Sequence, residues 1–129
     1  MRRHLFLAIS AVLAIAGSTG SAHHPFDSYD LDREVTVSGE VVRATYREPH
    51  SFLHVREVAT DGKADGKDVV WTAELPGVGT LRARGFTPQT LKAGERVTLR
   101  GHPGRVAAER RLWLTVVVRA HDGWTWSAP

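Results

Sequence analysis

Five short runs in which apolar and polar residues alternate constrain the fold of this chain more than any other feature. Such alternation is typical of strands with one buried face. The runs fall at residues 33–48, 51–58, 69–75, 96–101 and 110–120. We therefore expect an all-β fold.

A short helical segment and one glycine refine this prediction. Residues 78–86 predict a helix that ends at Gly85 and packs Leu81 inward. Gly39 interrupts the first alternating run, which predicts a long strand bent at a bulge. Three strands, a helix and two further strands are the order of a five-stranded Greek-key barrel of the oligonucleotide/oligosaccharide-binding type. A two-sheet β-sandwich is the alternative.

The beginning of the chain predicts a signal peptide. Two arginines are followed by an apolar run at residues 5–17, and the small residues Gly20 and Ala22 suit a signal-peptidase site. A membrane anchor is disfavoured because a spanning helix needs about 20 apolar residues. We therefore expect residues 1–22 to be removed on export to the periplasm, leaving a single domain at 23–129.

Composition narrows the classes of partner. The chain has no cysteine, which excludes disulfides and thiolate metal ligands. Loss of the signal peptide lowers the number of lysines and arginines from 17 to 15 against 14 acidic residues, so the net charge falls from +3 to +1. The basic residues are also spread along the chain, which disfavours a nucleic-acid partner. A metal site would need imidazole, carboxylate, backbone or terminal-amine ligands.

Two histidines far apart in the sequence are expected to meet. His50 precedes the second predicted strand and His102 follows the fourth, and in the barrel fold the two loops lie on the ligand-binding side. If residue 58 pairs with about residue 68, Glu74 faces Phe52 on the outer surface, one diagonal step from His50. A slip of one residue would move Glu74 to the wrong face. The sequence thus predicts two imidazoles and a carboxylate at one rim.

Cleavage after Ala22 would add a further ligand. His23 would become the first residue, and its free amine and ring nitrogen can chelate one metal ion because the amine has a pKa of about 7.7 to 8. A nitrogen-rich ligand set favours copper, with nickel or zinc weaker. The predicted function is an exported binding protein with copper as cofactor. Its candidate ligands are His23, His24, His50, His102 and Glu74, the last as ligand or as an orienting residue.

Two other functions stay open. A metal-free domain could bind a peptide, a glycan or an envelope protein through its outer sheet face, with Phe52, His54 and Thr72 as contacts. A copper-dependent redox enzyme is the third hypothesis. The chain lacks the G-x-S-x-G and H-E-x-x-H motifs, a glycine-rich phosphate loop and a cysteine nucleophile, so we assign no catalytic residue.

The four tryptophans are expected to stabilise the fold. Trp71 and Trp113 lie in predicted strands and are assigned to the core. Trp124 and Trp126 are expected to pack the carboxyl-terminal tail over the barrel. We therefore give none of them a ligand-binding role.

An ordered set of short motifs carries a family resemblance. The stretches are "AHHPFDSYD", "REPHSFLHV", "VVWTAEL" and "LKAGERVTLRGHP". In these the chain resembles the DUF6152 family, small exported proteobacterial proteins of uncharacterised function, from His23 to Gly123. Glu48, Phe86 and Glu95 stand where the family pattern has asparagine, tryptophan and aspartate. The resemblance implies export and a single domain, and it implies no particular activity.

Overall fold

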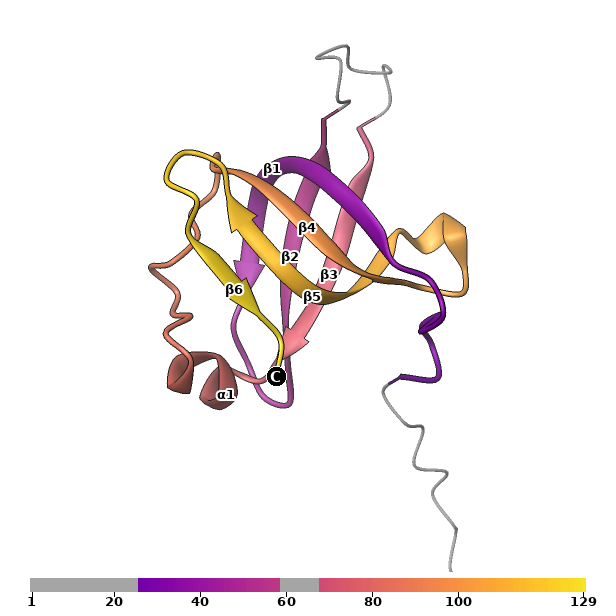
Figure 1. Cartoon of the computed structure of the whole chain (residues 1–129), viewed down its shortest axis with the longest axis horizontal. Helices are drawn as coiled ribbons and strands as arrows, with labels where there is room; N and C mark the ends of the chain where they lie inside the picture. The colour runs from indigo at the N-terminus through magenta and orange to yellow at the C-terminus, as the bar shows by residue number, and fades with distance from the viewer. Residues whose placement is uncertain (1–25, 59–67) are drawn as a thin grey trace, which may run out of the picture.

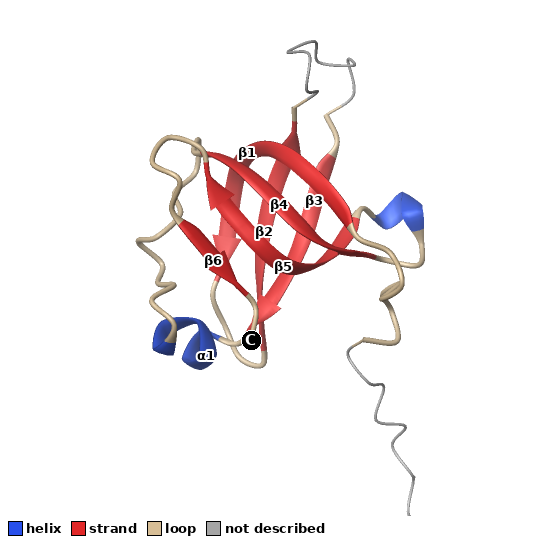
Figure 2. Cartoon of the chain, in the orientation of Figure 1, coloured by secondary structure: helices blue, strands red, loops and turns tan. Residues whose placement is uncertain are grey.

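The computed structural model describes residues 26–58 and 68–129, which form one sheet with one short α-helix and one 3-10 helix (Figures 1 and 2). The predicted signal peptide, His23 and His24 lie outside the described residues. The all-β prediction is confirmed. In chain order the elements are β1 (Val35–Thr45), β2 (His50–Glu57), β3 (Val70–Pro76), α1 (Val78–Ala83), β4 (Arg96–Pro103), the 3-10 helix (Ala107–Glu109), β5 (Arg111–Arg119) and β6 (Thr125–Ser127).

The sheet closes on itself. The strands are hydrogen-bonded in the order β3-β2-β1-β4-β5-β6, and β3 also pairs with β5 in parallel. Each strand from β1 to β5 thus has two neighbours within this ring (Figure 1), and α1 falls between β3 and β4 in the sequence. This ring matches the predicted five-stranded barrel order and not two facing sheets. β6, which the alternation does not predict, adds a short strand beside β5.

Alternate residues of each strand fill the interior. In β2, Leu53 and Val55 are buried, whereas Phe52 and His54 point outward and are half-buried. The same division in β3 buries Ala73 and Leu75 in the core, which turns Glu74 to the outside, opposite Phe52 of β2. The core consists of Val37, Val41, Leu53, Val55, Ala73, Leu75, Leu81, Phe86, Leu91, Val97, Leu99, Leu112, Leu114, Val117 and Trp126.

β1 contains a bulge, and its position differs from the prediction. Val41 pairs with Val55 and Arg43 with His54, so Val42 is the extra residue and not Gly39. Gly39 instead has a steric role. A Cβ atom at this position would lie 2.1 Å from the carbonyl oxygen of Arg56 on β2. Glycine therefore permits the close approach of the two strands.

The helix and the carboxyl-terminal tail cover one side of the core. Leu81 of α1 is buried, and the chain leaves the helix at Gly85, whose φ of 76° suits glycine. The buried Phe86 follows and meets Trp124 and Trp126 edge-on, with ring centroids 5.5 and 5.7 Å away. The tail tryptophans pack against the core as predicted. No helix among the described residues is long and apolar enough to cross a membrane.

Trp113 is not a core residue, contrary to the prediction. Its neighbours Leu112 and Leu114 are buried and occupy the inward positions of β5. Because side chains alternate along a strand, Trp113 points to the outer face. There it stands beside Glu74, its partner in the parallel pairing of β3 and β5.

Candidate functional site

Glu74 is a buried carboxylate on the outer face of the sheet. Only 7% of its surface is exposed, because the segment that precedes β1 crosses over it. Tyr29 of that segment is itself buried and forms an isolated bridge with Gly104, while the amide of Asp30 donates to the carbonyl of Pro103 at 2.9 Å. These contacts hold the segment against the end of β4 and close the site.

Both oxygens of Glu74 have partners. Oε2 accepts a hydrogen bond from the hydroxyl of Tyr29 and one from Nη2 of Arg111 at 2.9 Å. Oε1 lies 2.9 Å from Nδ1 of His50. The angles at this last contact are not those of a hydrogen bond, so it is an electrostatic contact. The guanidinium of Arg111 supplies the charge that balances the buried carboxylate.

Tyr29 acts as a fixed hydrogen-bond donor in this cluster. Burial raises the pKa of its hydroxyl, and the hydrogen bond and negative charge of Glu74 raise it further. The hydroxyl therefore keeps its proton at neutral pH and donates to Glu74. Arg111 also lies over the ring, with its guanidinium carbon 5.3 Å from the ring centroid of Tyr29.

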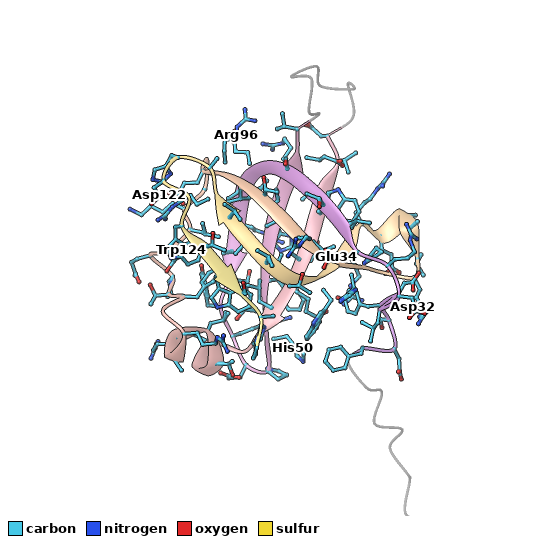
Figure 3. All side chains as sticks on the ribbon, viewed as in Figure 1. Asp32, Glu34, His50, Arg96, Asp122 and Trp124 are labelled. Atoms are coloured by element: carbon cyan, nitrogen blue, oxygen red, sulfur yellow. The ribbon has the colours of Figure 1, made fainter. Side chains whose placement is uncertain are left out.

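His50 is the part of the cluster that reaches solvent. Its side chain is 25% exposed, at the lower end of the barrel in Figure 3. With Nδ1 turned toward Glu74, Nε2 is the nitrogen left for a ligand. A carboxylate that accepts a hydrogen bond from an imidazole orients many metal-binding histidines, and Glu74 lies at the distance for such a bond, although the angles of the present contact do not form it. The predicted register, with Glu74 opposite Phe52 and near His50, is confirmed.

Trp113 joins His50 to the N-terminal segment. The centroid of its ring lies 5.9 Å from that of His50 and 4.8 Å from that of Phe26, the first described residue. Tyr29 packs against the same indole at 5.8 Å. The beginning of the described chain is therefore anchored beside His50 by aromatic contacts.

His102 reaches the same outer face but has a different partner. It pairs with Trp113 across β4 and β5, which puts both side chains on one face. Its Nδ1 lies 2.7 Å from the carbonyl oxygen of Arg33, whereas His50 contacts Glu74. Within residues 26–58 and 68–129, no group of three or more histidines, aspartates and glutamates is arranged to hold a metal ion.

The residues of the alternative binding prediction lie next to Glu74. His54 is opposite Thr72, and Phe52 is opposite Glu74, in the pairing of β2 with β3. The hydroxyl of Thr72 is 3.3 Å from Nδ1 of His54. All three side chains of this set, Phe52, His54 and Thr72, line one shallow hollow on the outer face.

His54 gives the stability of the protein a pH dependence. Burial, and then the positive charge of Arg43, lower the pKa of its imidazole. The unfolded chain keeps a histidine pKa of about 6.5, so below this pH it binds more protons than the folded state. We expect the free energy of unfolding to fall between about pH 7 and pH 5, and to fall less in His54→Gln, as measured by urea unfolding. Equal decreases in both proteins would contradict this assignment.

Two members of the cluster escape prediction from sequence. Tyr29 lies in the polar segment before the first predicted strand, which has no hydrophobic periodicity. Its aromatic ring is the feature that distinguishes it there. Arg111 precedes the inward Leu112, and its outward position follows from the alternation of β5. Its approach to Glu74 depends on the parallel pairing of Thr72 with Arg111, which the alternation within β5 does not specify.

Fold and site together define a small all-β protein in which a buried glutamate contacts a histidine on the outer face of a closed sheet. Comparison with known families adds the assignment. The chain belongs to DUF6152, a family of unknown function, whose model matches residues 11–113. The matched region contains the whole cluster around Glu74. No curated protein matches the chain.

Proposed function

We propose that this chain is an exported periplasmic binding protein that holds a transition-metal ion, with copper favoured, between its mature amino terminus and His50. The observation that carries the proposal is that Phe26 and His50 both make edge-on aromatic contacts with one residue, Trp113. His23 precedes Phe26 by three positions in the sequence, and three residues of extended chain span at most about 11 Å. A terminal chelate at His23 would need a span of this order to reach His50.

The chemistry of His50 supports this proposal. Glu74 faces Nδ1, so Nε2 of the same ring is the nitrogen that would bind the ion. The amine and imidazole of His23 would supply further nitrogen ligands. Such a nitrogen-rich site has a higher affinity for copper than for nickel or zinc. His24 and His102 are additional candidates. Glu74 would act by orienting His50, because both of its oxygens already have partners.

Calorimetric titration with Cu(II) tests the proposal on protein processed to begin at His23. We expect His50→Ala to weaken copper affinity at least about tenfold, since even the loss of an orienting residue behind a ligand costs that much. Acetylation of the terminal amine should weaken it as well, because it removes the amine ligand of the terminal chelate. Mass spectrometry of the amino terminus of periplasmic protein tests the cleavage after Ala22.

The matched control is His121→Ala. His121 neighbours Asp122, which lies at the upper left of Figure 3, away from His50. This variant should bind copper as the unsubstituted protein does. An absence of copper binding, or equal affinity in His50→Ala, would overturn the proposed function.

A further inference from the structure

A second feature of the outer face is a hollow that the copper proposal does not use. It lies over β1, β2 and β3, which run side by side in Figure 2, and has a volume of about 320 Å³. Water occupies about 30 Å³ per molecule in the liquid, so the hollow has room for a body the size of a monosaccharide. Its lining residues are Arg43, Thr45, Arg47, Phe52, His54 and Thr72.

The hollow is positively charged. None of its lining residues is acidic, and neither Arg43 nor Arg47 forms an ion pair with any of the described residues. Glu74 is opposite Phe52 in the sheet, but its oxygens are engaged by Tyr29, Arg111 and His50. Two guanidinium groups therefore face the hollow without a neutralising partner, which favours an anionic ligand.

The sheet register places polar groups beside an aromatic ring. Arg43, His54 and Thr72 form one row across the three strands, and Thr45 and Phe52 lie in the next. Arg47 covers the ring of Phe52, with its guanidinium carbon 5.0 Å from the ring centroid. The hollow thus offers hydroxyl and imidazole groups for hydrogen bonds, an apolar surface, and two groups that bind carboxylates.

We propose that this hollow binds a small hydroxylated carboxylate of monosaccharide size, such as a hexuronate. The carboxylate pairs with Arg43 and Arg47, whose planar guanidinium groups match its two oxygens. The ligand's hydroxyls bond to Thr45, Thr72 and His54. This site is separate from the proposed copper site, since its lining residues do not include His50, Glu74 or Trp113.

Titration of the processed protein with glucuronate, followed by NMR, tests the inference. We expect the amide signals of His54 and Thr72 to shift, and glucuronate to bind at least about tenfold more tightly than glucose, because a charge-assisted hydrogen bond contributes that factor. Arg43→Ala and Arg47→Ala should each weaken glucuronate binding by a similar factor. Binding should also weaken at high salt, because the two arginines lie on the surface.

Arg110→Ala is the matched control. Arg110 stacks on Trp71, 5.6 Å from its ring centroid, in a different hollow that is also lined by arginines. The Arg110→Ala variant should bind glucuronate with unchanged affinity. His50→Ala should do so too, and this result would distinguish the hollow from the proposed copper site. The inference would be overturned if glucuronate did not bind, or if glucose or acetate bound with the same affinity as glucuronate. It would also be overturned if Arg110→Ala lost as much affinity for glucuronate as Arg47→Ala. Thermal unfolding checks that every variant is folded.

Discussion

Glu74→Ala is expected to lower the free energy of unfolding by about 3 kcal/mol. The carboxylate is buried and has three partners, so its removal affects groups from separate parts of the chain. The buried hydroxyl of Tyr29 loses its acceptor, and such an unsatisfied group costs about 1 to 3 kcal/mol. Arg111 loses the carboxylate that it neutralises, and the N-terminal segment loses its polar attachment to β3. Urea unfolding monitored by tryptophan fluorescence measures the change.

Two variants show whether the loss belongs to this cluster. Glu34→Ala removes a carboxylate 3.1 Å from Arg100, a pair whose members are both about half exposed, and should cost less than about 1 kcal/mol. Tyr29→Phe removes one hydroxyl and leaves Glu74 with Arg111 and His50, so we expect a loss of about 1 kcal/mol. The combined Tyr29 and Glu74 variant should lose less than the sum of the two losses. A stability of Glu74→Ala within about 0.5 kcal/mol of the unsubstituted protein would contradict the role assigned to Glu74.

The contact of Glu74 with His50 shows what sequence alone can predict. Both residues belong to one hairpin, β2 and β3, and alternation in each strand fixes which side chains face outward. A single assumed register then decides their neighbours, and a slip of one residue would have changed them. The prediction placed Glu74 opposite Phe52, and the sheet has this pairing.

The rest of the cluster depends on contacts between remote segments. Arg111 reaches Glu74 through the parallel pairing that closes the barrel, and Tyr29 through a segment that packs across the finished sheet. Neither contact is marked by local periodicity. A large aromatic residue in a strand is usually buried, which predicts Trp113 in the core, but the two leucines beside it take the inward positions. Its outward placement gives Phe26 and His50 a common contact.

Gly39→Ala is expected to cost about 3 kcal/mol, because the added methyl group has no space. Its Cβ would lie 2.1 Å from the carbonyl oxygen of Arg56 and 2.6 Å from Cγ1 of Val55. The first atom belongs to the backbone of β2, and the second to a fully buried core side chain. Neither can rotate away, so β1 and β2 must separate and lose ladder hydrogen bonds.

The control is the same chemical change at Gly79, in α1. There a Cβ would meet only Oε1 of Glu48, at 3.2 Å, which is the end of a flexible side chain and also accepts a hydrogen bond from the amide of Gly79 at 2.7 Å. Alanine has a helix propensity about 1 kcal/mol better than that of glycine, which offsets a weakening of this exposed bond, so Gly79→Ala should change the free energy of unfolding by less than about 1 kcal/mol. Urea unfolding of both variants separates a specific backbone contact from a general effect of replacing glycine. If Gly39→Ala proved no less stable than Gly79→Ala, the close approach of β1 and β2 at Gly39 would not be a requirement of this fold.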